Sequence, residues 1–184
     1  TGCGAYTLYA QTTGADNTGV GYGALFTNTT GSNNSALGCN TLLNSTTASN
    51  NVAIGKDALK ANTTGTKNTA VGSLAADANT TGDFNVAVGY FSLSANTTGS
   101  KNIAVGMSAL ESNTTADNNT AVGHNSLLAN TTGSQNVAVG ANALDANTTA
   151  DNNTAVGFQA LTSVTTADGN AAFGPKTLEN NTTG

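Results

Sequence analysis

Few residues in this chain could carry catalytic chemistry. The sequence contains one histidine, His124, and two cysteines, Cys3 and Cys39. A nucleophile needs a general base within hydrogen-bond reach, and no Ser-His-Asp, HExxH or phosphate-binding loop pattern accompanies these residues. His124 follows a glycine, and the residue after the matching glycine elsewhere is tyrosine, lysine, alanine or phenylalanine. We therefore expect His124 to be an ordinary surface residue, and the sequence predicts neither an enzyme nor a cofactor.

Four aspartates recur in one register and raise the possibility of calcium, which takes carboxylate ligands. They are Asp83, Asp117, Asp151 and Asp168, each two residues before the asparagine that begins a 17-residue unit. The glycine-rich calcium nonapeptide is absent, and serine or threonine fills this register in other units. We interpret the aspartates as solvated corner residues, so no metal site is predicted.

Asn-Thr-Thr triplets recur along the chain, as at Asn96, Thr97 and Thr98. Each triplet is formally an N-glycosylation sequon, although stacked polar ladders explain the pattern without modification. Regularly spaced threonines could also order water as an ice-binding surface does. Because adjacent residues of a strand point to opposite sides, only one threonine per unit would then face outward.

These residues belong to a tandem repeat of 17 residues, present about eleven times without insertion or deletion. The consensus is N-[TV]-A-V-G-x-x-A-L-x-A-N-T-T-[GA]-x-x. Recurring positions include Asn51, Asn119, Val71, Val122, Gly72, Gly123, Leu93 and Leu127. The units begin at residues 17, 34, 51, 68, 85, 102, 119, 136, 153 and 170, after a partial unit at 1–16.

A strict short period predicts a single all-β domain over residues 1–184, a parallel β-solenoid with one coil per repeat. Identical positions would stack ~4.8 Å apart, so the rod would be roughly 50 Å long. We expect T-A-V to be a strand with valine inward, and glycine to form a corner. A-L-x-A should give a second inward surface, with a single helical turn as the alternative.

This register also places the cysteines. Cys3 falls in the valine column and is predicted to be buried, whereas Cys39 follows a corner glycine and should be exposed. Their separation along the rod, about 10 Å, is too large for a disulfide.

At V-A-I-G the sequence resembles the head repeats of trimeric autotransporter adhesins. The matching segment is Asn50-Asn51-Val52-Ala53-Ile54-Gly55, and Asn118 to Gly123 is similar. That resemblance implies a parallel β-roll that trimerises and contacts host surfaces. The period of 17 differs from about 14 in that family. The longer consensus with N-T-T-G resembles the repeats of phage tail-fibre and other surface-fibre proteins.

Charge and composition narrow the function. The net charge is -5 with five lysines and no arginine, which argues against nucleic-acid binding. No apolar run is long enough for membrane insertion. The sequence predicts a homo-oligomeric fibre module, trimeric, on an extracellular, cell or virion surface, with a glycan or protein receptor as its external partner. An ice-binding solenoid and a head-to-tail filament are the alternatives, because no charged cap blocks either end.

Overall fold

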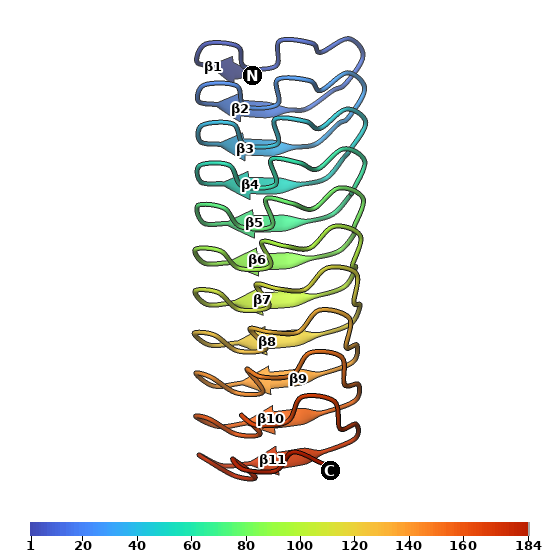
Figure 1. Ribbon diagram of the computed structural model, residues 1–184. Helices are drawn as coiled ribbons and strands as arrows, with labels where there is room; N and C mark the ends of the chain where they lie inside the picture. The colour runs from blue at the N-terminus through green and yellow to red at the C-terminus, as the bar shows by residue number, and fades with distance from the viewer. Residues whose placement is uncertain (184) are drawn as a thin grey trace.

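The computed structural model describes residues 1–183 as a parallel β-solenoid, in which successive coils stack along one axis (Figure 1). Each coil contributes one short strand, and the strands form a single sheet in chain order. Partners are 17 residues apart in register, as in Thr69 beside Val86. The strands are β1 (Gly2–Cys3), β2 (Thr18–Val20), β3 (Ser35–Leu37), β4 (Val52–Ile54), β5 (Thr69–Val71), β6 (Val86–Val88), β7 (Ile103–Val105), β8 (Thr120–Val122), β9 (Val137–Val139), β10 (Thr154–Val156) and β11 (Ala171–Phe173). The predicted β-solenoid is confirmed.

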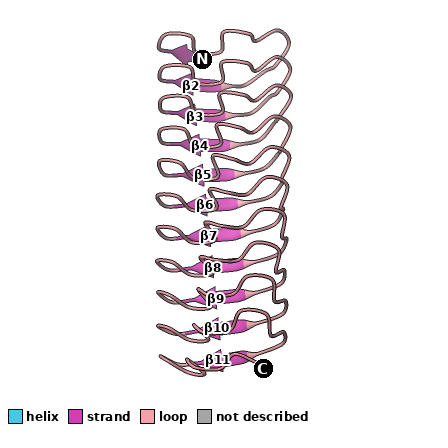
Figure 2. Cartoon of the chain, viewed as in Figure 1, coloured by secondary structure: helices cyan, strands magenta, loops and turns pink. Residues whose placement is uncertain are grey.

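The rest of each coil consists of turns and bends (Figure 2). The helical-turn alternative for A-L-x-A is wrong, because this segment forms turns and no helix occurs in residues 1–183. The leucine of the segment has a left-handed backbone, with φ of 53° at Leu93 and 50° at Leu127. A helix needs negative φ at every residue, so this leucine ends any helical path. Across the described chain, no helix has the length and apolarity to cross a membrane.

The interior of the coil differs from the predicted one at the strand. The central alanine points inward, and Ala70 and Ala121 are completely buried. The predicted inward orientation of Val71 and Val122 is wrong, since both are only half-buried on the outer face. In a three-residue strand the first and third side chains share a face, so one buried alanine forces its neighbours outward.

The second inward surface is as predicted. Leu93 and Leu127 are fully buried, and Ala76 takes the same place in its coil. Leucines and strand alanines form one apolar core that runs along the rod. The core is narrow, because two columns of buried asparagine fill the remainder of the interior.

Candidate functional site

The asparagine that precedes each strand forms a buried ladder through the whole rod. The Asn119 backbone N–H donates to Oδ1 of Asn102 at 3.0 Å, and the Asn119 Nδ2 donates to the Gly133 carbonyl at 2.8 Å. Asn51, four coils before Asn119, makes the equivalent bonds to Asn34 Oδ1 and to the Gly65 carbonyl. Each amide thus joins neighbouring coils on both sides, which confirms the predicted asparagine ladders.

The asparagine of the N-T-T triplet forms a second ladder. Asn96 Nδ2 donates to Asn79 Oδ1 at 2.8 Å and to the Gly99 carbonyl at 2.9 Å. Ser45 and Val164 interrupt this column, and both are fully buried. Each interruption leaves the Oδ1 of the preceding asparagine, Asn28 or Asn147, buried without a hydrogen-bond partner among residues 1–183.

The corner glycine packs against the next coil too closely for any side chain. Gly72 has φ of 144° and Gly123 has φ of 136°. A Cβ added to Gly123 would lie 2.5 Å from the Gly140 carbonyl oxygen. Both the backbone angle and the contact with the next coil therefore require glycine, as the repeat predicted.

The two threonines of each triplet have different surroundings. The Thr97 hydroxyl donates to the Thr114 carbonyl of the next coil at 3.1 Å. Thr98 is exposed, as is the second threonine of every described unit. One threonine per coil therefore faces water, which agrees with the expectation from sequence.

The recurring aspartates act as caps between coils. The Oδ1 of Asp117 accepts the Ser100 backbone N–H, and that of Asp151 accepts the Ser134 backbone N–H, both at 2.6 Å. Serine does the same elsewhere, as where Ser134 accepts the Asp117 N–H at 3.2 Å. These residues are thus structural, and residues 1–183 contain no group of three or more possible metal ligands.

The single histidine and the two cysteines belong to different coils of the rod. His124 is exposed on its corner, as predicted. Cys3 and Cys39 are both free and exposed. The prediction for Cys39 is confirmed, whereas the buried position predicted for Cys3 is wrong, because its column lies on the outer face of the sheet.

The outer side of the sheet is an apolar surface, which we call the valine face. It consists of the first and third side chains of strands β2 to β11, mostly valine, isoleucine and threonine. Leu37, Ile54 and Ile103 are 49%, 39% and 40% exposed there. No strand residue carries a charge. The sequence shows the valine column of this face, but the hydrophobicity of valine predicts that the column is buried, whereas the structure places it outside.

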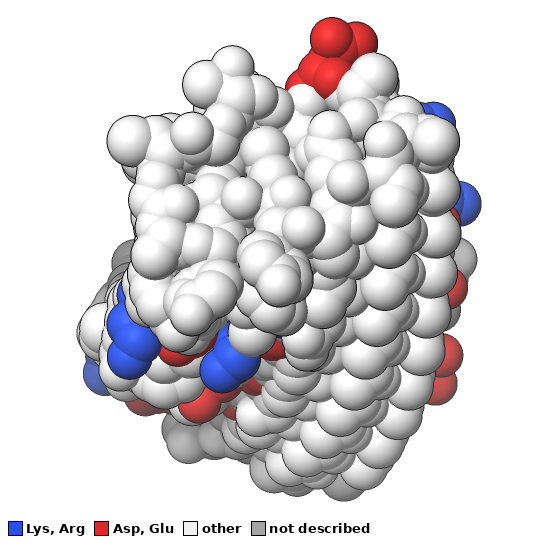
Figure 3. Space-filling model, turned by 90° about the horizontal axis from the view of Figure 1, so that it is seen from above, with Lys and Arg blue, Asp and Glu red and all other residues white. Residues whose placement is uncertain are grey.

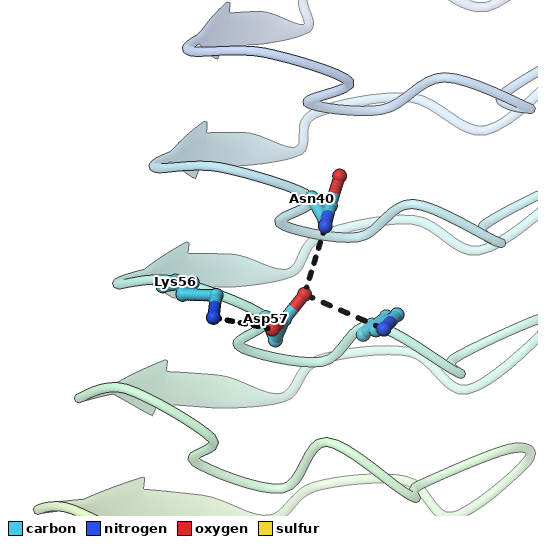
Figure 4. A network of polar contacts seen from close by, with 4 residues as sticks. Asn40, Lys56 and Asp57 are labelled. Atoms are coloured by element: carbon cyan, nitrogen blue, oxygen red, sulfur yellow. Dashed lines mark hydrogen bonds and ion pairs between the residues drawn. The ribbon is translucent and has the colours of Figure 1, made fainter.

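Charged side chains elsewhere are sparse, as the view along the rod shows (Figure 3). One small network surrounds Asp57, which is 7% exposed. It accepts a hydrogen bond from Asn40 at 3.0 Å, and the ammonium groups of Lys56 and Lys60 lie 3.8 and 3.5 Å from its carboxylate (Figure 4). Burial raises the pKa of the nearby Asp77 carboxyl, and the Asp57 charge adds to this shift. The backbone N–H of Asp77 and the Lys60 charge oppose it.

Aromatic side chains of the first two coils form a group, the aromatic cluster. It comprises Tyr6, Tyr9, Tyr22 and Phe26. The Tyr6 and Tyr22 rings meet edge to face, with centroids 5.6 Å apart and planes at 83°. Tyr9 stacks on Phe26 at 5.3 Å. Tyr6 and Tyr22 are exposed, as expected for polar-tipped aromatics on a corner, but they are grouped and not scattered. The missed signal is that these four residues fall in nearby columns of successive coils.

Searches with family models, among curated proteins and among solved structures found no match to the chain. The architecture shown is a tandem 17-residue repeat that forms a β-solenoid with asparagine ladders.

Proposed function

We propose that this chain is a structural repeat module of an extracellular or virion-surface fibre, and that it is not an enzyme. The observation that carries the proposal is the asparagine ladder before the strands, which links each coil to the next without a break from Asn17 to Asn170. Repeated hydrogen bonds along one axis give a stiff rod, whose role is to hold a binding surface away from a parent body. The resemblance to autotransporter heads and tail-fibre repeats supports the same role.

We further propose that three copies assemble through the valine face. An exposed apolar surface that runs along a whole rod is typical of an interaction surface. A second copy of the chain is the occupant that fits best, because it presents uncharged side chains with the same coil-to-coil spacing. Closed cyclic symmetry would cover this face in every copy, and a trimer is the state implied by the adhesin-head resemblance.

The test is the mass in solution by sedimentation equilibrium. We expect a discrete species of three times the 18.0 kDa chain mass. A Val88→Lys substitution places a charge on the valine face and should give monomers. Their far-ultraviolet circular dichroism spectrum should be unchanged, since the fold of each chain is kept. The matched control is Thr98→Lys, on an exposed residue outside the strands, which should stay trimeric. A monomer at all concentrations would refute assembly, and a mass that grows with concentration would favour the head-to-tail filament.

Ice binding is the second candidate, and the exposed threonine column favours it. The second threonine of each triplet recurs at every coil, and no side-chain hydrogen bond within residues 1–183 occupies the Thr98 hydroxyl. The distinguishing measurement is thermal hysteresis of the wild-type protein and of a variant with Thr81, Thr98 and Thr115 changed to lysine. Hysteresis that the triple substitution abolishes would support this function, and none at millimolar protein would end it.

A further inference from the structure

A hollow of ≈ 460 Å³ lies beside the aromatic cluster. Its volume falls within the range of small-molecule binding sites. Its lining includes the aromatic residues Tyr6, Tyr22 and Phe26, and Asn40 and Asn44 of the next coil. Tyr9 stacks on Phe26 but does not itself line the hollow.

The hollow exists because Gly23 replaces a larger residue of the repeat. The same position holds Asn40 in the next coil and Asn125 and Asn142 further along, all with positive φ. A Cβ built on Gly23 would lie 3.2 Å from the Asn40 Oδ1 and 3.2 Å from the Leu43 Cδ1. This glycine therefore leaves open a space that a side chain fills in other coils.

The lining specifies the chemistry of a ligand. The Tyr6 and Tyr22 rings are nearly perpendicular and 54% and 56% exposed, so they offer two apolar walls with hydroxyl groups at their rims. The Asn44 amide is exposed, and the Asn40 Nδ2 is held by Asp57, which leaves the Asn40 Oδ1 directed at Gly23. No lysine, histidine or carboxylate lines the hollow.

We propose that this hollow binds a neutral saccharide. A sugar ring presents apolar C–H faces, which pack on aromatic rings, and hydroxyls that both donate to and accept from amides. The absence of charged lining residues disfavours phosphorylated or acidic ligands, which need cationic partners. A proline-rich peptide could also use an aromatic-lined groove. The Asn40 Oδ1 favours the saccharide, because a sugar hydroxyl can donate a hydrogen bond to it, whereas a polyproline backbone has no N–H donor.

This inference deepens the proposed function, since it names a surface that the rod would present. It rests on the proposed function only for its biological setting, because the hollow lies within one chain. Binding can therefore be measured whether or not the protein is a trimer, and sedimentation of the same samples reports assembly separately.

The experiment uses maltotetraose, cellotetraose and the fully N-acetylated chitotetraose as neutral probes, with titration calorimetry and the tyrosine ring resonances as readouts. Three of the four tyrosines of the chain belong to the cluster, so their signals report the site. We expect at least one probe to bind at a single site and to shift the Tyr6 and Tyr22 resonances. Tyr22→Ala should lower its affinity at least tenfold, and Gly23→Asn, which restores the repeat residue, should do the same by filling the hollow.

The matched control is Phe158→Ala. Phe158 occupies the position of Tyr22 eight coils later and is 48% exposed, but it does not line the hollow. This variant should bind the probe as the wild type does, and all three variants should keep the wild-type far-ultraviolet spectrum. No binding of any probe at millimolar concentration would overturn the proposal, as would binding that Tyr22→Ala leaves unchanged. Binding of decaproline in place of the sugars would also overturn it.

Discussion

Repair of the second asparagine ladder at Ser45 gives a quantitative test of what holds the rod together. Ser45 Oγ and Asn28 Oδ1 are both buried and have no hydrogen-bond partner in the described part of the chain, residues 1–183. A Ser45→Asn substitution places an amide in the column, where its Nδ2 can donate to Asn28 Oδ1. Intact steps of this ladder have distances of 2.8 Å, as between Asn96 and Asn79, to 3.1 Å, as between Asn130 and Asn113.

The expected gain follows from the cost of the orphaned groups. A buried polar atom without a partner costs about 1–3 kcal/mol. Ser45→Asn should therefore raise the free energy of unfolding by about 1–3 kcal/mol, since it satisfies the Asn28 acceptor. For a chain of this size each kcal/mol corresponds to roughly 2–4 °C in the unfolding midpoint. Urea titration and calorimetry would measure both quantities.

Two control variants separate ladder repair from other effects. Ser45→Ala removes the orphaned hydroxyl and adds no donor, so it should gain less than Ser45→Asn. Asn96→Ser creates a break of the same kind at an intact step and orphans Asn79 Oδ1, so it should lose about 1–3 kcal/mol. If Ser45→Asn folds but is no more stable than wild type, while Asn96→Ser costs nothing, the ladders do not stabilise the rod.

Two further predictions test the corners and the charged network. Gly123→Ala should destabilise the fold by several kcal/mol or prevent folding, because the added Cβ would meet the Gly140 carbonyl at 2.5 Å. Gly169 also has a positive φ, 72°, but a Cβ added there would meet no atom within 4 Å. Gly169→Ala should therefore lower the free energy of unfolding by only about 1 kcal/mol in denaturant titrations, and equal losses for the two variants would contradict the packing argument. Burial raises the pKa of Asp77 in the folded chain above its ordinary value of 3.8. Asp77 therefore ionises more easily in the unfolded chain, and the free energy of unfolding falls as the pH rises from 3.8 through the folded pKa. Asp77→Asn should thus be more stable than wild type at neutral pH, and the two should converge below pH 3.8; a difference that grows in acid would refute this assignment.

Much of the fold could be predicted from the sequence, because a strict period stacks identical residues on one another. Once Asn51 and Asn119 fall in one column, a ladder of amides follows, and Leu93 and Leu127 in another column imply a continuous core. Glycine at position 123 likewise indicated a corner. These features depend on the period and need no knowledge of the path of the chain within a coil.

The features that the sequence did not predict depend on that path. Hydrophobicity favours Val71 over Ala70 for the interior, yet alternation on a three-residue strand forces a choice, and the narrow interior admits the alanine. Leu93 favours helix intrinsically, but it takes a left-handed backbone to turn the coil while its side chain is buried. The aromatic hollow requires Tyr6 and Tyr22 to meet across coils, a contact between different columns that the period alone does not show.

Thiol labelling at three positions would test the central claim most directly, which is that alanine faces the interior and the valine face is covered by other copies. The background replaces the exposed Cys3 and Cys39 with serine, and single cysteines then replace Ala87, Val88 or Thr98. We predict that a maleimide reacts fast at position 98, hardly at position 87, and at position 88 slowly in the assembly but fast after dilution to monomers. Fast reaction at position 87 would contradict the fold, and reaction at position 88 as fast as at position 98 in concentrated protein would contradict the assembly.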